Sequence, residues 1–355
     1  MPQPHPRTLR QFDPNGVGLQ NGRFIGLPFS EDEARLVFYS VPWDVTVSYG
    51  EGTARGPENI LQASTQMDLY DPDLPDAWRI GYYFRPPDPD WLATNQHWRA
   101  ESRSYIAFLE AGGQVRQNAN MADRLQRINQ AGAEHTARIK RETAAILDRG
   151  QLVGLVGGDH STPLGYLQAL AERHAAFGIL QIDAHHDLRE QYEGFAYSHA
   201  SIFHQVLDLP QVKQLVQVGI RDYCAEEVER VREHPERLYV LYEHERQERF
   251  FTGTTWAEQC RQLIDRLPQK VYISFDVDGL RPELCPHTGT PVPGGLHFAE
   301  AIFLLRTLSR SGRTIIGFDL CETAGLPHEW DGNVSARLLY KMANLCALTQ
   351  GWPTT

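Results

Sequence analysis

Residues 177–187 read FGILQIDAHHD, and the change of character within this stretch decides the fold. A mainly apolar, strand-like run ends where Asp183, His185 and Asp187 begin to alternate along the chain. Alternate side chains of an extended chain point to one face, so these three polar groups converge at the end of a strand. The sequence therefore predicts a buried strand whose carboxyl end carries a polar site.

Similar apolar runs recur with helical stretches between them: LVGLVGGDH (152–160), VKQLVQVGI (212–220), RLYVLY (237–242), KVYISFDVD (270–278) and RTIIGFDL (313–320). Near-continuous apolar strands that alternate with helices are typical of a parallel sheet that helices cover on both faces. We therefore expect an α/β fold on a mainly parallel sheet. The run LVFYSV (36–41) adds a first strand, and the apolar spacing over 121–149 predicts a long helix.

The chain shows no internal repeat and no clear domain boundary, so we expect a single domain over 35–355. Residues 1–34 are polar and rich in Pro, Gly and Asn, which favours an N-terminal arm. Between about 70 and 100, prolines and acidic residues accompany three tryptophans. We interpret this segment as an ordered excursion that forms a pocket wall or a subunit contact, because aromatic side chains on a flexible tether would promote aggregation.

The charge balance limits the partners of the chain. Its 355 residues include 34 Lys and Arg against 45 Asp and Glu, a formal charge of −11, which argues against nucleic acid or an anionic membrane as the main partner. No apolar run approaches the roughly 18 residues that span a bilayer, and the start MPQPHPRTLRQF lacks a secretory apolar core. The five cysteines form no CxxC pair and suit a reducing compartment. We expect a cytoplasmic protein.

Four of the predicted strands end in residues that carry chemistry: Asp159-His160, Asp183 to Asp187, Asp276-Val-Asp278, and Asp319 to Glu322. In parallel sheets, ligands bind beyond the carboxyl ends of the strands. Burying several unpaired carboxylates together costs several kcal/mol each, against a net domain stability of roughly 5–15 kcal/mol. The only basic residues within or beside these motifs are Arg189 and Arg281, so a divalent metal is the better counter-charge.

The candidate metal ligands are two imidazoles and four carboxylates: His160, His185, Asp183, Asp187, Asp276 and Asp278. Six side chains exceed the needs of one tetrahedral zinc ion and suffice for two ions about 3.5–4 Å apart that share carboxylates. Oxygen-rich ligation with some imidazole suits Mn²⁺ and leaves Ni²⁺, Co²⁺ or Fe²⁺ open. A metal-bridging water that ionises near neutral pH is the natural nucleophile. Glu322 is left over, and a spare carboxylate favours a cationic substrate such as a guanidinium.

Several motifs in series resemble the ureohydrolase family, the group of arginases and agmatinases. They are GGDHS (157–161), DAHHD (183–187), YSHAS (197–201), SFDVDGL (274–280), TGTPVPGG (288–295) and GFDLCE (317–322), and they follow the family's order over roughly residues 150–350. The resemblance implies a three-layer α/β/α sandwich. It also implies assembly into a homo-oligomer, a trimer or a hexamer.

The resemblance further implies a role for each site residue. One metal ion would be held by His160, Asp183, Asp187 and Asp276, and the other by Asp183, His185, Asp276 and Asp278. The hydroxide that bridges them would attack a guanidinium carbon and release urea plus ammonia or an amine. His199 would move protons and Glu322 would orient the substrate cation. We expect Asp159 to orient a ligand through hydrogen bonds, and His186 and Cys321 to face away by strand alternation.

The chain also departs from the family pattern. Arg281 stands where the family usually has an acid after DVDGL, and the stretch LREQYEGFAYSHAS (188–201) resembles agmatinases more than arginases, which disfavours arginine as substrate. VPWDVTVSYGEGTARGP (41–57) and HEWDGNVSARLLYKM (328–342) are similar to a subgroup that includes nickel-dependent guanidine hydrolases and alkylguanidine hydrolases. That similarity predicts a substrate smaller than agmatine, with Trp43 or Trp330 closing the pocket.

Other functions stay open at this point. Within the same reaction class, the alternatives are an agmatinase, a guanidinobutyrase or a formimidoylglutamase. Zinc deacetylases use a related fold, but they need one metal and leave the second carboxylate of Asp276-Val-Asp278 unexplained. A non-catalytic subunit of a hetero-oligomer would be expected to lose ligands, and none is lost. Nucleotide chemistry is disfavoured because no GxGxxG or P-loop pattern follows the first strand.

Overall fold

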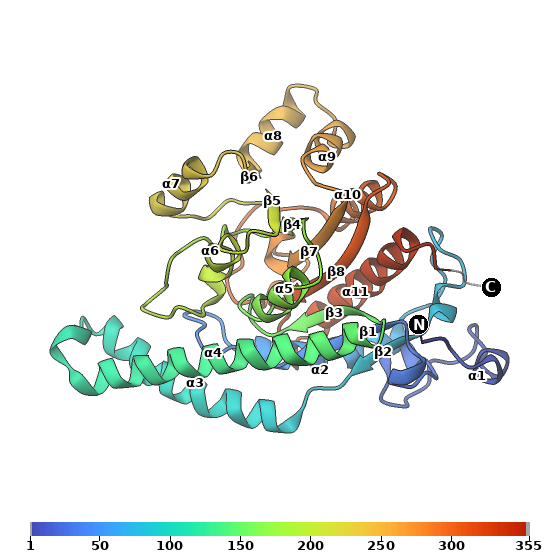
Figure 1. Ribbon diagram of the computed structural model, residues 1–355, viewed down its shortest axis with the longest axis horizontal. Coiled ribbons are helices and arrows are strands. Elements are labelled where there is room, and N and C mark those ends of the chain that lie inside the picture. The colour runs from blue at the N-terminus through green and yellow to red at the C-terminus, as the bar shows by residue number, and fades with distance from the viewer. Residues whose placement is uncertain (1, 353–355) are drawn as a thin grey trace.

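The computed structural model describes residues 2–352, in which eight strands form one sheet with every neighbouring pair parallel (Figure 1). The strand order across the sheet is β2-β1-β3-β8-β7-β4-β5-β6. The strands are β1 (Leu36–Val41), β2 (Tyr82–Arg85), β3 (Leu152–Gly157), β4 (Phe177–Ile182), β5 (Val212–Val218), β6 (Leu238–Leu241), β7 (Lys270–Asp276) and β8 (Thr314–Cys321). The predicted parallel sheet is confirmed.

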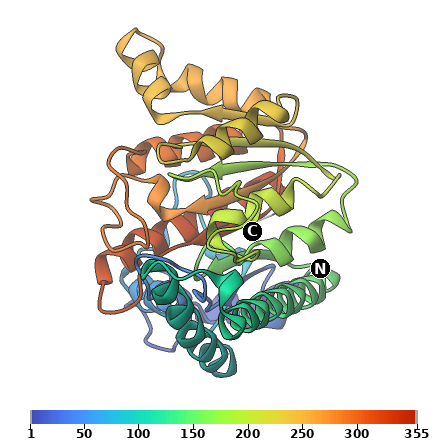
Figure 2. The ribbon, with the colours of Figure 1, turned by 90° about the vertical axis from the view of Figure 1, so that its left-hand side faces the viewer.

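The helices form a layer on each face of this sheet. They are α1 (Pro6–Gln11), α2 (Gly56–Ala63), α3 (Pro89–Glu110), α4 (Ala119–Asp148), α5 (Leu164–Ala171), α6 (Ile202–Val206), α7 (Ala225–Glu233), α8 (Glu243–Phe251), α9 (Trp256–Asp265), α10 (Phe298–Ser309) and α11 (Glu329–Thr349). The buried side chains of α3, α4, α5 and α6 form one core with one face of the sheet, and those of α9, α10 and α11 form another core with the opposite face. Figure 2 shows the sheet between these helices. The predicted α/β/α sandwich is confirmed.

The central strands are apolar on both sides because each side packs against helices. In β4, Leu180 and Ile182 belong to one core and Ile179 to the other, and all three are fully buried. Burying one such side chain stabilises a fold by about 1.5–3 kcal/mol, so a run of this kind is held firmly in the sheet. Helix α4 contributes Ile128, Ile139 and Ile146 on one face, the spacing from which a long helix is predicted.

Two segments of unusual composition are part of this architecture. In residues 1–34, the side chains of Phe24, Leu27 and Phe29 are buried in the core that includes α11. The Trp-rich segment forms the short helix η5 (Ala77–Ile80), the edge strand β2 and the first half of α3. The sequence pattern predicted neither β2 nor α3, because β2 has only four residues and the prolines between the two elements interrupt the pattern.

No helix within residues 2–352 is both long enough and apolar enough to cross a membrane. All five cysteines are free thiols, and four of them are buried.

Candidate active site

The four polar strand ends lie next to each other in the middle of the sheet. Strands β3, β8, β7 and β4 are consecutive neighbours, and the motifs that begin with Asp159, Asp319, Asp276 and Asp183 occupy or follow their carboxyl ends. The ends approach closely, since a Cβ on Gly279 would come within 2.6 Å of the Asp183 backbone nitrogen. The topology therefore brings together all six candidate ligands.

His160 lies among carboxylates in the interior. Its ring is fully buried, and Nδ1 lies 2.9 Å from Asp183 Oδ2, 3.0 Å from Asp187 Oδ2 and 3.5 Å from Asp276 Oδ2. Within residues 2–352, Nδ1 finds no hydrogen-bond partner in good geometry. A nitrogen that three carboxylate oxygens surround at this range is suited to ligate a cation that they share.

His185 forms a second group with two further carboxylates. Its Nδ1 lies 3.0 Å from Asp278 Oδ2 and 3.7 Å from Asp183 Oδ1, and its side chain is partly exposed. One possible ligand atom from each of His160, Asp183 and Asp276 lies within 4.8 Å of the other two. The same holds for Asp183, His185 and Asp278. Asp183 belongs to both groups, so the geometry offers two adjacent cation sites that share one carboxylate.

The electrostatics of the cluster show an excess of buried negative charge. Burial raises the pKa of Asp187 to about 7, and the neighbouring carboxylate of Asp183 adds to the shift. Burial raises the pKa of Asp276 well above its ordinary value, and Asp278 and Asp183 reinforce the effect. Conversely, the carboxylates raise the pKa of His160 well above its ordinary value, although burial alone would lower it. A divalent cation is the group that such donors fit.

Two backbone conformations at the cluster are strained. Asp187 (φ 56°) and Glu322 (φ 65°) adopt left-handed conformations that cost a non-glycine residue about 1–3 kcal/mol. Residues held in this way concentrate at functional sites, where the surrounding structure fixes them.

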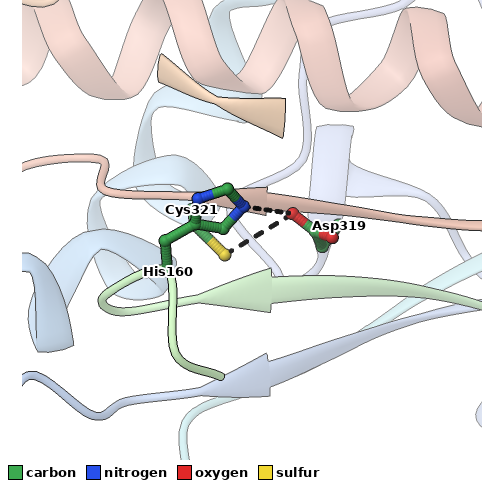
Figure 3. A group of neighbouring side chains, drawn as sticks. All are labelled: His160, Asp319 and Cys321. Atoms are coloured by element: carbon green, nitrogen blue, oxygen red, sulfur yellow. Dashed lines mark hydrogen bonds and ion pairs between the residues drawn. The ribbon is translucent and has the colours of Figure 1, made fainter. Parts of the chain in front are cut away.

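The far side of His160 is held by a short hydrogen-bond chain. Nε2 lies 2.9 Å from Ser274 Oγ, and Ser274 Oγ donates to Asp319 Oδ2 at 2.7 Å. Figure 3 shows the ring of His160 turned toward Asp319, with Cys321 on the same side. These three residues form a further group of possible ligands, but the Ser274 hydroxyl already joins His160 to Asp319, and burial raises the pKa of the Cys321 thiol well above its ordinary value. We interpret these hydrogen bonds as contacts that hold the His160 ring in place, and not as a third metal site.

His199 lines a cavity of about 160 Å³ beside the cluster. The cavity walls include the two cluster residues His185 and Asp187, together with Ser48, Arg189, Tyr192, His199, Ala200, Asp222, Tyr223, Glu227 and Thr290. Burial lowers the pKa of His199 to about 3, with a further contribution from the positive charge of His185. The imidazole of His199 is therefore neutral near physiological pH.

Glu322 lies beside His160 but outside the residues that line this cavity. Its Oε1 accepts a hydrogen bond from the His160 backbone nitrogen at 3.0 Å, whereas Oε2 has no partner in residues 2–352. The loop at Thr288 and Gly289 covers it, because Thr288 Oγ1 donates to the Glu322 carbonyl and a Cβ on Gly289 would lie 3.2 Å from Oε2. Burial, with repulsion from Asp159, raises its pKa well above the ordinary value.

Asp159 makes different contacts from those expected. Its Oδ1 accepts hydrogen bonds from the backbone nitrogen (3.0 Å) and hydroxyl of Ser161, and Oδ2 has no partner among the residues that the structure describes. No hydrogen bond of its carboxylate to a candidate ligand is present in residues 2–352, so the geometry gives its expected orienting role no support. Ser274 and Asp319, to which the sequence analysis gave no such role, take that position behind His160.

Neither tryptophan expected to close the pocket does so. Trp43 stacks on His135 with ring centroids 3.9 Å apart, and both line a separate cavity between α3 and α4. Trp330 is 54% exposed, and its indole nitrogen donates to the Glu283 carbonyl.

Arg281 does not face the cluster either. It pairs with Glu283 at 2.7 Å and contacts His297 at the surface. An arginine at this position therefore leaves the cluster's own contacts intact.

Sequence reasoning also missed Gln181 and Gln217, which lie inside β4 and β5 and are fully buried. The signal that could have found them is a polar residue in an otherwise apolar strand, because a buried amide must find hydrogen-bond partners.

The sequence and the fold of the chain are similar to those of known proteins. The model of the arginase family matches residues 34–346. The chain is 30% identical to the N(1)-aminopropylagmatine ureohydrolase of Thermus thermophilus, over 90% of this chain and 93% of that protein. It is 28% identical to the guanidinobutyrase of Pseudomonas aeruginosa, over 90% of this chain and 88% of that protein. The solved structure of proclavaminate amidino hydrolase from Streptomyces clavuligerus shares the fold, with a TM-score of 0.70, 21% identity, and coverage of 94% of this chain and 100% of that chain.

Proposed function

The chain belongs to the arginase family, and we propose that it hydrolyses a small guanidino compound to urea plus ammonia or an amine. Membership makes it a hydrolase of amidino C–N bonds, and the identity of the substrate is the proposal. The observation that carries it is the convergence of His160, His185 and four carboxylates at the ends of neighbouring strands, beside a small cavity lined by His199.

Two divalent ions fit the donor set. The first would be held by His160 Nδ1 with Asp183, Asp187 and Asp276, and the second by His185 Nδ1 with Asp183, Asp276 and Asp278. The unpartnered Nδ1 of the buried His160 and the raised pKa values of Asp187 and Asp276 favour a cation here. When bound, such ions supply an activated water and positive charge for the reacting centre. Mn²⁺ and Ni²⁺ are the proposed ions, since both accept mixed oxygen and imidazole ligands.

The remaining side chains act on the substrate. His199 lines the cavity, where its imidazole can pass a proton to the leaving amine as a general acid–base group. One ring nitrogen, Nδ1, lies 3.5 Å from Ser198 Oγ, which leaves Nε2 for this transfer. Glu322 Oε2 has no partner within residues 2–352, and a guanidinium beside it would favour the charged carboxylate that burial disfavours.

The charges around the cavity favour a neutral or cationic substrate tail. Asp222 is largely exposed at the wall, with Oδ2 3.9 Å from His185 Nε2, and Glu227 is buried beside it. Arg189 is the only cation of fixed charge among the residues that line the cavity within 2–352. It lies over the Tyr192 ring at 5.0 Å and 3.9 Å from Glu227, so its charge is partly balanced. We therefore rank guanidine, methylguanidine and agmatine ahead of 4-guanidinobutyrate and formiminoglutamate.

Urea release tests the proposal directly. Metal-free protein is reconstituted separately with Mn²⁺ and with Ni²⁺, and urea is measured with guanidine, methylguanidine, agmatine and 4-guanidinobutyrate. We expect turnover of one of the first three, and the active metal identifies the cofactor. The control is Asp276→Asn, which should lose turnover and metal together because a shared carboxylate is gone. Two bound metals with no urea from any of the four substrates would contradict the proposal and direct the search to formiminoglutamate.

A homo-oligomer, trimer or hexamer, stays a prediction from the family resemblance. Light scattering on the purified chain would decide the assembly.

A further inference from the structure

A row of buried polar side chains crosses the sheet beneath the candidate metal ligands. Gln217 of β5 pairs in register with Gln181 of β4, Gln181 with Ser274 of β7, and Ser274 with Asp319 of β8. All four are fully buried. The row lies two residues before Asp183 on β4 and two before Asp276 on β7, so these side chains share a face with the ligands.

The β4–β5 half of the row makes a continuous hydrogen-bond chain that ends on Asp183. Gln217 Nε2 donates to Gln181 Oε1 at 2.6 Å, and Gln181 Nε2 donates to Asp183 Oδ2 at 2.8 Å. His186 stands at the other end, where its Nδ1 lies 2.6 Å from Gln217 Oε1. Its ring is fully buried and close to Tyr223 and Tyr242.

Backbone carbonyls fix the direction of this chain. Gln181 Nε2 also donates to the His185 carbonyl at 3.1 Å, and Gln217 Nε2 donates to the His186 carbonyl at 3.0 Å. A carbonyl oxygen only accepts, so neither amide can be flipped without setting oxygen against oxygen. Gln217 must then present its oxygen to His186, and His186 must carry its proton on Nδ1. The position of this proton follows from the hydrogen-bond contacts alone.

From this geometry we infer that His186, Gln217 and Gln181 are positioning residues that present one fixed N–H donor to Asp183, a carboxylate common to both metal groups. The inference rests on the proposed function, because it assumes that these hydrogen bonds serve the metal centre. Asp183 Oδ1 is held separately by the His185 backbone nitrogen at 2.7 Å. With a donor on each oxygen, the carboxylate is restrained in one orientation, and such outer contacts typically change metal affinity by about 10–100-fold.

The first experiment tests the direction of the chain on the unaltered protein. Selective ¹⁵N labelling of histidine, with His186→Asn for assignment, reports which ring nitrogen of His186 carries the proton. We expect the Nδ1–H form in the metal-free and the metal-loaded protein. The Nε2–H form would overturn the inference, whatever the enzyme does with substrate.

The second experiment measures affinity and stoichiometry for Mn²⁺ alone by titration calorimetry. Gln181→Leu removes the donor to Asp183, and we expect a 10–100-fold weaker affinity for at least one ion. His186→Leu should act in the same direction, and His186→Asn should restore most of the affinity because an Asn amide can place a donor where Nδ1 lies. Kinetics on the loaded variants should show a fall in kcat at saturating metal with a smaller change in KM.

The matched control is Gln259→Leu, which removes an equally buried glutamine amide of α9 that bonds only to the Arg246 and Thr254 carbonyls within residues 2–352. It should lower stability without changing metal affinity. If wild-type protein binds two ions and folded Gln181→Leu binds them within twofold of wild type, the inference is wrong while the proposed function stands. If wild-type protein binds no ion, the proposed function fails, and the role inferred for these hydrogen bonds fails with it.

Discussion

His199 shows how the surroundings of a side chain set its charge state. A surface histidine is partly protonated near neutral pH, whereas His199 lines the cavity and its pKa falls to about 3 because burial disfavours its charged form and the nearby His185 repels a second positive charge. The imidazole is therefore neutral near physiological pH. The sequence motif YSHAS pointed to this residue, but its charge state depends on neighbours far away in the chain.

The first prediction concerns this side chain. His199→Ala should leave two ions bound and slow turnover by about 10²–10⁴-fold, because a general acid–base group is lost. Metal content by elemental analysis and kcat from urea release check the two parts separately. His199→Gln serves as the control, since it keeps a polar group and still cannot exchange a proton. Wild-type kcat in both variants would remove His199 from the mechanism.

At the scale of elements, strand register explains what the sequence could and could not predict. The buried strands were predicted closely, β4 to the residue and β5 with its end two residues too late, because helices on both faces demand continuous apolar runs. The ligand motifs were visible because they interrupt such runs at strand ends. The supporting residues were hidden, since Gln181, Gln217 and Ser274 acquire their roles only through cross-strand partners that no local pattern specifies. The edge strand β2 was missed because it has only four residues, which prolines follow directly, and these carry too little pattern.

The second prediction follows from the register between β7 and β8. Ser274→Ala breaks the link from His160 Nε2 to Asp319 and leaves that fully buried carboxylate without its 2.7 Å hydroxyl donor. We expect a loss of about 1–3 kcal/mol in the free energy of unfolding and a 10–100-fold weaker affinity for the ion that His160 binds.

Ser274→Thr keeps the hydroxyl and is the matched comparison for that experiment. Ser64→Ala removes another buried hydroxyl, which donates to the Leu61 carbonyl, and should destabilise the fold without touching metal affinity. Equal metal affinities in Ser274→Ala and wild type would show that the chain behind His160 is structural only.

At the scale of the whole molecule, the fold gathers the buried carboxylates of the site at one edge of the sheet. Four neighbouring strands of a two-sided sheet deliver their polar ends to one edge, and the helices that cover both faces keep most of these carboxylates from water. The raised pKa values of Asp187, Asp276 and Glu322 reflect first their burial and then their mutual repulsion. A fold of this kind gains stability from any cation that binds the folded chain and not the unfolded one.

The last prediction tests that coupling. At a hundredfold excess over its Kd, each bound ion should add about 2.7 kcal/mol to the free energy of unfolding. Two ions should then raise Tm by about 5–10 °C above that of chelated protein. Scanning calorimetry with chelator, Mn²⁺ or Ni²⁺ measures the shift, and Asp276→Asn should lose most of it because the variant lacks a carboxylate that both ions need. A Tm that does not respond to either metal in the wild type would mean that the repulsion in the cluster is relieved by protons alone, and the two-ion interpretation of His160, His185 and their carboxylates would have to be abandoned.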